Sequence, residues 1–154
     1  MFSIRKDTGI IPHVLTQILD QCVNGVTLSD PDLEDNPIVY ANKAFEKMTG
    51  YSNDEIVGRN CRFLQGDDRN QPGIGQVRDA ISSGTPTEVT LRNYRKDGGV
   101  FHNHLTVTPL YDLDGSIIYF LGVQYDITDQ VEADREIAVL ERKLASALSG
   151  GQSD

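Results

Sequence analysis

The residues best suited to chemistry lie in segment 58–66, which has the sequence GRNCRFLQG. A thiol, Cys61, stands between the carboxamide of Asn60 and the guanidinium of Arg62, and a second carboxamide, Gln65, follows. In one or two helical turns, Asn60 and Leu64 share one face, and Cys61 and Gln65 share the next. Such a surface places a nucleophile, an amide and a cation around one flat ligand with a polar rim. A free Cys is more often a small buried apolar residue, but these polar neighbours argue against a plain core helix.

Two further carboxamides occupy runs that are typical of strands. Asn93 lies in the run LRNY and Asn103 in the run FHNH. Asn is uncommon in strands, so two Asn residues that point inward require an explanation. Strand alternation places Leu91 and Asn93 on one face, and Asn103 and Leu105 on one face of the next strand. Buried carboxamides without a partner are costly, whereas exposed ones would be unremarkable, and we favour a bound ligand that pairs with them.

The elements that must position these residues are short strands and short helices. We expect strands at about 26–29, 38–41, 87–95, 100–110 and 117–126, and helices near 43–48, 53–57 and 74–81, with Asn42 as a helix cap. Asp-Gly steps in 96–99 and 112–115 predict hairpins between the last three strands. The short helices can cover the sheet face that these strands leave open. The order indicates an α+β fold.

Helical extensions are predicted on both sides of this core. Residues 1–24 contain one amphipathic segment, with Pro12 suited to a first helical position and a turn signal at Asn24-Gly25. Residues 129–148 predict a longer helix, and 149–154 a disordered tail. The longer helix has a coiled-coil-like seam of Ala133, Ile137, Leu140, Leu144 and Ala147. The predicted organisation is therefore extension 1–24, core 25–128, helix 129–148 and tail 149–154.

Size and charge limit the possible functions. The 154 residues are enough for one domain with extensions, and a net charge of −9 weighs against direct nucleic-acid binding. The charged start of the sequence has no apolar stretch behind it, so we expect no secretory signal. No run approaches about 18 apolar residues, so we expect no membrane span. Cys22 and Cys61 lie far apart in unlike contexts, which fits free thiols in a reducing cytoplasm and predicts no metal site.

The Cys61 segment and the order of elements resemble the light-oxygen-voltage (LOV) family, flavin-binding blue-light receptors of the PAS fold. The resemblance spans about residues 26–128 and implies a five-stranded antiparallel sheet with short helices covering one face. It implies FMN as the cofactor and Cys61 as the photoreactive cysteine, whose sulfur bonds reversibly to the flavin C4a carbon. Gln124 matches the glutamine beside flavin N5, and its rotation would relay the signal to the flanking helices.

The resemblance also implies a set of cofactor contacts. Asn60 and Gln65 match groups that hold the ribityl chain and phosphate side, and Arg62 and Arg78 match arginines that bind the phosphate. The remaining expected contacts are Thr27, Asn36, Arg69, Ile74, Ile81, Leu91, Asn93, Asn103, Leu105, Val107, Phe120 and Gly122. Among the departures, Ile74 stands where some bacterial short LOV proteins have a further phosphate arginine, whereas Arg69 matches another such site. His102 and His104 are expected to face away from the flavin.

Four functions compete. The first is a short LOV photoreceptor that undergoes a light-driven self-reaction without substrate turnover, and the second is the sensor module of a longer protein such as a histidine kinase. A flavin redox enzyme is disfavoured because no nicotinamide-binding glycine fingerprint and no resolving thiol are present. A ligand-free PAS interaction domain would not need Asn93, Asn103 and Gln124. The expected partners are a second copy of the chain, bound through both extensions, and an unknown downstream signalling protein.

Overall fold

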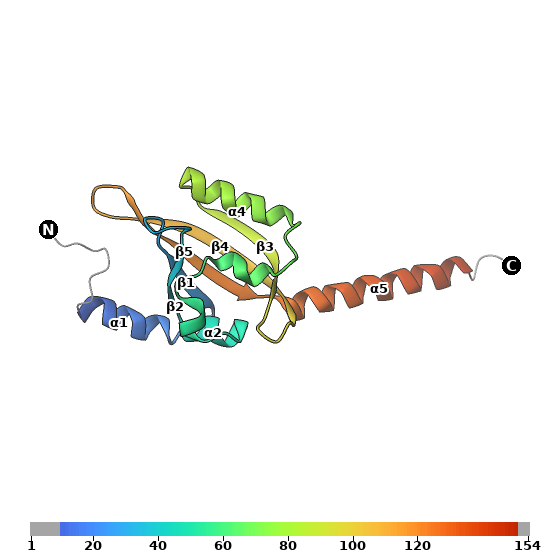
Figure 1. The fold of residues 1–154 in the computed structure, drawn as a ribbon. Coiled ribbons are helices and arrows are strands. Elements are labelled where there is room, and N and C mark those ends of the chain that lie inside the picture. Colours follow the sequence, from blue (N-terminus) through green and yellow to red (C-terminus); the bar gives the residue numbers. More distant parts are fainter. Residues whose placement is uncertain (1–9, 151–154) are drawn as a thin grey trace.

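The computed structural model describes residues 10–150, and its strands form one antiparallel sheet (Figure 1). The strands are β1 (Gly25–Ser29), β2 (Ile38–Ala41), β3 (Thr87–Tyr94), β4 (Val100–Tyr111) and β5 (Ile117–Asp126). Their order in the sheet is β2-β1-β5-β4-β3. The expected five-stranded antiparallel sheet is therefore confirmed. Because β1 pairs with β5, the first and last strands of the core lie side by side, with Thr27 opposite Gly122.

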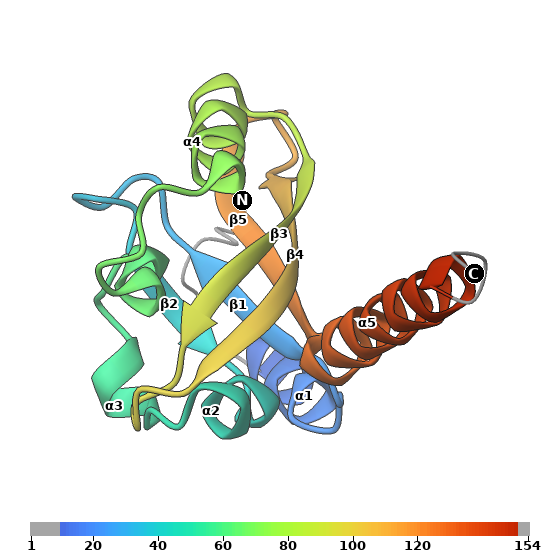
Figure 2. The ribbon, with the colours of Figure 1, turned by 90° about the vertical axis from the view of Figure 1, so that its right-hand side faces the viewer.

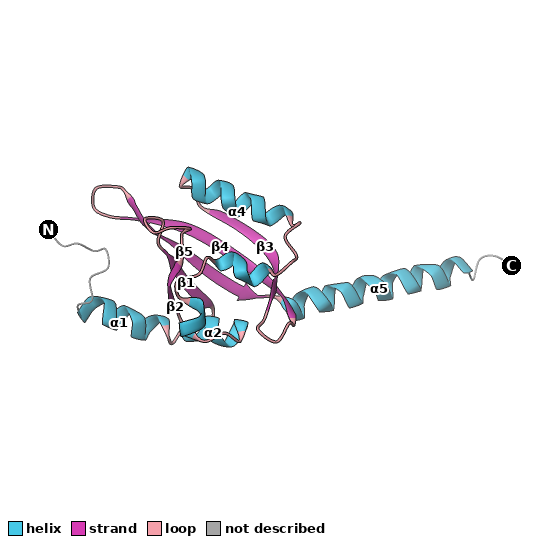
Figure 3. Ribbon diagram, in the orientation of Figure 1, coloured by secondary structure: helices cyan, strands magenta, loops and turns pink. Residues whose placement is uncertain are grey.

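Short helices cover one face of this sheet, as Figures 2 and 3 show. They are α2 (Lys43–Thr49), α3 (Asn53–Ile56), the 3₁₀ helix η1 (Cys61–Gln65) and α4 (Pro72–Ser83), and the flanking helices are α1 (Ile10–Leu19) and α5 (Thr128–Gly150). Local capping explains why α2 and α3 are short. Asn42 Oδ1 accepts from Phe45 N at the start of α2, and Gly50 ends that helix with φ of +78°. Ser52 and Glu55 form a capping box at α3.

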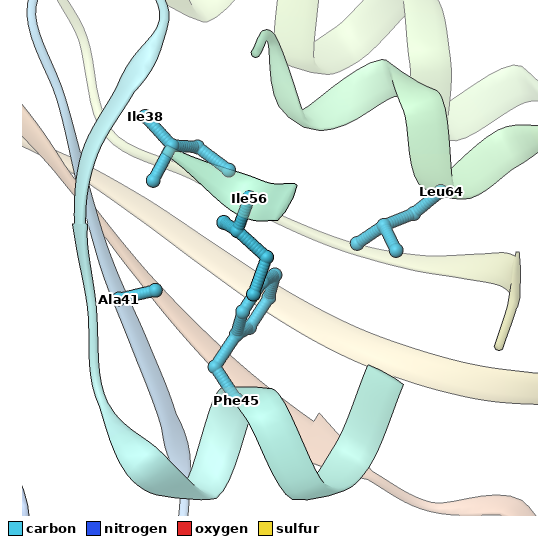
Figure 4. Packing of buried hydrophobic residues seen from close by; sticks show 5 residues of the cluster. All are labelled: Ile38, Ala41, Phe45, Ile56 and Leu64. Atoms are coloured by element: carbon cyan, nitrogen blue, oxygen red, sulfur yellow. The ribbon is translucent and has the colours of Figure 1, made fainter. Parts of the chain in front are cut away.

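Two apolar clusters join the helices to the sheet. The first consists of Ile38, Ala41, Phe45, Ile56 and Leu64 (Figure 4). The second consists of the sheet residues Val89, Leu91, Leu105, Val107 and Phe120, against which Ile74, Val77 and Ile81 of α4 pack. The buried positions of β4 alternate along the strand, so its inward face carries Asn103, Leu105 and Val107. The two clusters fix η1 and α4 above the same sheet face.

The N-terminal extension differs from the sequence-based expectation at its ends. Helix α1 begins at Ile10, before Pro12, and ends at Leu19 rather than at the turn signal near Asn24. It ends early because the Asn42 side chain binds the carbonyls of both Leu19 and Asn24, at 2.9 and 3.0 Å, and turns the chain toward β1. Cys22 therefore lies beyond the helix and is exposed, as a free thiol.

Helix α5 projects away from the sheet (Figure 1). It starts at Thr128 and includes Ser149 and Gly150, so the prediction that these two residues belong to a tail is wrong. Its apolar seam is largely exposed, with Leu140 at 63% and Leu144 at 61% exposure. Residues 1–9 and 151–154, the outer parts of the predicted extensions, lie outside the described residues. Within residues 10–150, no helix combines the length and the apolar character that a membrane crossing requires.

Candidate functional site

A cavity of about 440 Å³ lies between the helical cover and the inward face of the sheet. That volume falls within the roughly 300–1,000 Å³ typical of small-molecule and cofactor sites. Its walls come from the β1–β2 loop, η1, α4 and the inward positions of β1, β3, β4 and β5. The cavity touches both apolar clusters, through Phe45 and Leu64 on one side and Leu91 and Phe120 on the other. The fold therefore encloses one site built by segments far apart in sequence.

Cys61 lies at the first position of η1 and lines the cavity. Asn60 precedes the helix as its cap, and its Oδ1 accepts from Arg62 N at 3.0 Å. Asn60 therefore holds the turn rather than sharing a face with Leu64. Although Cys61 is accessible to solvent, the dense protein around it raises the pKa of the thiol, an effect that the neighbouring Arg62 charge opposes. Cys61 is thus a protonated thiol at neutral pH rather than a thiolate.

Two carboxamides line the sheet side of the cavity. Asn103 Nδ2 donates to Asn93 Oδ1 at 2.9 Å, and Asn93 Nδ2 donates to the Arg92 carbonyl at 3.1 Å. Both side chains are buried, with exposures of 2% for Asn103 and 3% for Asn93. In the part of the chain that the structure describes, Asn103 Oδ1 has no hydrogen-bond partner. Buried polar atoms are rarely left unpaired, so this oxygen points to a ligand with a donor group.

Gln124 presents a second unpaired amide oxygen. Its Nε2 donates to Thr27 Oγ1 at 3.3 Å, whereas no described residue pairs with its Oε1. Gly122, on the same strand face, leaves room for this contact. A Cβ at position 122 would lie 2.6 Å from Thr27 Oγ1 and 2.8 Å from Gln124 Nε2. Asn36, in the β1–β2 loop, has a third such oxygen and also lines the cavity.

Cations gather at the cavity wall formed by η1 and α4. Among residues 10–150, its charged lining consists of Arg62, Arg69, Arg78 and a single carboxylate, Asp35. Arg62 forms an ion pair with Asp35, and Arg69 Nε donates to the Gly66 carbonyl at 3.1 Å. Guanidinium groups bind phosphate and carboxylate oxygens with paired hydrogen bonds. The excess of positive charge suits an anionic ligand group.

The cavity brings together all of the residues that the sequence selected for the site. Arg78 and Ile81 come from α4, Val107 from β4, and Arg69 from the loop after η1. Their binding roles remain predictions. The cavity also includes lining residues that the sequence did not single out, namely Ser29, Pro31, Leu33, Asp35, Ile38, Phe45, Leu64, Val77 and Ser82. The apolar residues among them look like ordinary core residues in the sequence. Asp35 belongs to the run of turn formers at 35–37, and that run is the one sequence signal of a structured loop beside the cavity.

His102 and His104 of β4 lie outside the cavity lining. On β4 they alternate with the buried Phe101 and Asn103. His104 Nε2 lies 2.6 Å from Glu88 Oε1, and its Nδ1 lies 3.2 Å from Thr90 Oγ1, on the opposite face of the sheet. They are therefore placed away from the site, as the strand alternation predicted.

Comparison with known proteins places the chain in a family. A PAS domain model matches residues 23–129. The chain is 48% identical over 144 residues to blue-light-activated histidine kinase 1 of Erythrobacter litoralis (strain HTCC2594), covering 93% of this chain and 40% of the kinase. Among curated relatives, the first matches are longer proteins, of which the chain spans about half the length or less.

Solved structures agree with this placement. The structure of an RNA-binding light-oxygen-voltage receptor matches with a TM-score of 0.78 and 34% identity, covering 92% of this chain and 40% of that one. A light-oxygen-voltage domain studied with a flavin analogue matches with a TM-score of 0.71 and 38% identity, covering 90% of this chain and 99% of that one. The chain therefore belongs to the PAS domain family and, within it, to the light-oxygen-voltage (LOV) group.

Proposed function

We propose that this chain is a blue-light photoreceptor that binds FMN in the cavity and uses Cys61 as its photoreactive group. One observation carries the proposal. The cavity that contains the Cys61 thiol also contains the buried amide oxygens of Asn103 and Gln124, and no described residue pairs with either oxygen. A core that served packing alone would leave no such oxygens unpaired, because each costs about 1–3 kcal/mol. The LOV relatives support a flavin as the ligand.

The residues of the cavity fit FMN at three points. The isoalloxazine ring has one edge that alternates donors and acceptors, and Asn93 with Asn103 offers both kinds of group. The apolar lining from Leu91, Leu105 and Phe120 suits the flat ring. The arginines at the η1 and α4 wall suit the terminal phosphate, and the net positive charge there would favour FMN over uncharged riboflavin.

Cys61 supplies a thiol at the wall of this cavity. If FMN occupies the cavity, it would supply the absorption of blue light. Cys61 would supply the sulfur for a reversible bond to it, together with the proton that is given up as the bond forms and regained as it breaks. The raised pKa of Cys61 keeps that proton on the sulfur in the dark. No substrate is consumed in such a cycle, so the chain would act as a receptor and not as a turnover enzyme.

Gln124 is positioned to pass the change to both helical extensions. Its side chain contacts Thr27 on β1, the strand that follows α1. Two residues further along β5, Asp126 Oδ1 accepts from Thr128 N at 3.0 Å and so fixes the start of α5. Arg95 Nη2 donates to Asp126 Oδ2 at 2.9 Å and ties this junction to the β3–β4 hairpin. Rotation of the Gln124 amide would therefore act on two elements that lead out of the core.

The protein that receives the signal depends on whether the chain is part of a longer protein. The chain spans only part of the related histidine kinase, which supports a role as the sensor module of a longer signalling protein. A role as a short photoreceptor that signals through a homodimer is the alternative. In both cases, α1 and α5 would carry the signal to a partner protein in the cytoplasm.

The test is to identify the chromophore of the purified full chain. We expect a yellow protein that releases one FMN per chain on denaturation, identified by chromatography against riboflavin and FAD standards. Blue light should bleach the visible band reversibly. A colourless protein that does not take up FMN when it is added would contradict the proposal, as would a flavin whose spectrum does not respond to light.

A further inference from the structure

The loop between β1 and β2 brings a carboxylate to the cavity wall that holds the arginines. Its ends are joined by a hydrogen bond from Asp30 N to the Pro37 carbonyl at 3.0 Å, and Asn36 N donates to the Leu33 carbonyl at 3.2 Å. Asp35 and Asn36 both have positive φ angles, of +67° and +47°. Two successive non-glycine residues in the left-handed region are unfavourable, and such strain is often found at functional sites.

This conformation ties Asp35 to both neighbours of Cys61. The Asp35 carboxylate pairs with the Arg62 guanidinium, and the Asp35 carbonyl accepts from Asn60 Nδ2 at 2.7 Å. Asp35, Asn60 and Arg62 all line the cavity. The fixed loop backbone therefore holds a negative charge against one of the arginines expected to bind the cofactor phosphate.

From these contacts, we propose that Asp35 is a specificity-determining residue, which competes with the ligand phosphate for Arg62 and so limits the preference for FMN over riboflavin. This rests on the proposed binding of FMN. A guanidinium N–H that points at a carboxylate is not free for a phosphate oxygen, and the two anions repel each other. The pair is half exposed, at 46% for Arg62 and 53% for Asp35, so water weakens it and a phosphate dianion can displace it.

Riboflavin provides the internal reference, because it has the same ring and ribityl chain without the phosphate. Competition at Arg62 would weaken FMN binding alone. A general effect of Asp35 on the loop or on Asn60 would instead change the binding of both flavins. The ratio of the two dissociation constants therefore separates a role in specificity from a role in structure.

The decisive variant is Asp35→Asn. Asparagine tolerates the left-handed conformation as well as aspartate does, so the loop should fold unchanged. Glu34→Gln is the matched control, since Glu34 is exposed in the same loop but lies outside the cavity lining. Dissociation constants for FMN and riboflavin would be measured on the full chain after flavin removal, by quenching of flavin fluorescence.

We expect Asp35→Asn to bind FMN roughly two- to fivefold more tightly, the effect of removing one half-exposed charge, with riboflavin unchanged. Glu34→Gln should change neither constant. In an Arg62→Gln background, the gain from Asp35→Asn should shrink to what the direct repulsion between the Asp35 carboxylate and the phosphate contributes. Weaker FMN binding by Asp35→Asn, or an equal change for both flavins, would overturn the inference while leaving the proposed function intact. If the native chain binds neither flavin, the proposed function and this inference both fail.

Discussion

The Asn103 side chain donates through Nδ2 to Asn93 Oδ1 across the β3–β4 pair, at 2.9 Å. The two residues are not opposite each other in the ladder, since Asn103 pairs with Leu91 and Asn93 pairs with Phe101. The contact is therefore a diagonal one between inward-facing side chains. It fixes which way each amide points and leaves Asn103 Oδ1 as a free acceptor among the described residues. The sheet thus presents an ordered polar edge to the cavity.

Replacing Asn103 with Ala should weaken flavin binding. The change removes the free acceptor and leaves Asn93 Oδ1 without its donor. Losing a buried hydrogen bond of this kind should cost about 1–3 kcal/mol of binding free energy. The dissociation constant for FMN can be compared with that of Asn70→Ala, which changes an exposed loop residue outside the cavity lining. Equal affinity of the native chain and Asn103→Ala would exclude Asn103 as a ligand contact.

Two glycine-to-alanine substitutions, at Gly122 in the cavity and at Gly75 in α4, test whether the cavity needs glycine at position 122. Both add one methyl group, but only the first adds it within the site. In Gly122→Ala, the new Cβ would approach Thr27 Oγ1 and Gln124 Nε2 to 2.6 and 2.8 Å, so these side chains must move. We expect a lower melting temperature and altered light-dark spectral changes. Gly75→Ala in α4 meets no described atom within 4 Å and should stabilise the helix by up to about 1 kcal/mol. Thermal melts of the two variants should therefore shift in opposite directions.

Asp68 should make part of the stability depend on pH. Arg92 binds its carboxylate through Nε at 2.7 Å and Nη2 at 2.9 Å, and the Tyr94 hydroxyl donates at 2.8 Å. The Arg92 hydrogen bonds, followed by that of Tyr94, lower the pKa of Asp68 from 3.8 to about 2. A carboxyl group with a lowered folded-state pKa stabilises the fold above its unfolded pKa and loses that contribution as the pH falls through the folded value.

The variant Asp68→Asn should therefore be less stable than the native chain at pH 6, and the difference should shrink as the pH falls from about 4 to about 2. Urea unfolding at several pH values would measure it. Asp67→Asn, next to it in an exposed position, serves as the control and should not show this narrowing. A stability difference that stays constant down to pH 2 would contradict the role of the Asp68 ionisation.

Much of the site is predictable from the sequence because several of its residue types are unusual for the elements in which they lie. Two Asn residues in strands, and a thiol flanked by polar residues, are enough to indicate a ligand. The hairpin signals and the capping role of Asn42 are equally local, so the sheet and the short helices follow from the order of residues. Side-chain periodicity also places His104 on the outer face.

Other features depend on contacts between distant segments. The Asp35–Arg62 pair requires positive φ angles in the β1–β2 loop, and nothing in the residue types alone places those side chains together. The early end of α1 follows from Asn42 binding two carbonyls of the preceding segment. In both cases, tertiary contacts decide the local conformation: an ion pair in the loop and two hydrogen bonds at the end of α1. Sequence periodicity does not record such contacts.

Association of two chains is expected to involve the exposed seam of α5. Ile137, Leu140 and Leu144 are 53%, 63% and 61% exposed, and α1 exposes Leu15 and Ile18. Burying one Leu side chain contributes about 1.5–3 kcal/mol, so Leu144→Gln should shift the native chain toward monomer. Lys143→Gln, on a neighbouring exposed position outside the seam, should not. Light scattering over a concentration series would distinguish them, and a native chain that stays monomeric at micromolar concentration would refute the dimer.

The most direct test of the account is the light-minus-dark absorption spectrum of the native chain beside that of Cys61→Ser. We expect the native protein to lose its visible flavin band under blue light, gain near-ultraviolet absorption, and recover in the dark. Cys61→Ser should bind FMN equally well, remain fluorescent and show no such bleaching, because a hydroxyl replaces the thiol at the cavity wall. If Cys61→Ser bleaches and recovers as the native protein does, Cys61 is not the photoreactive group.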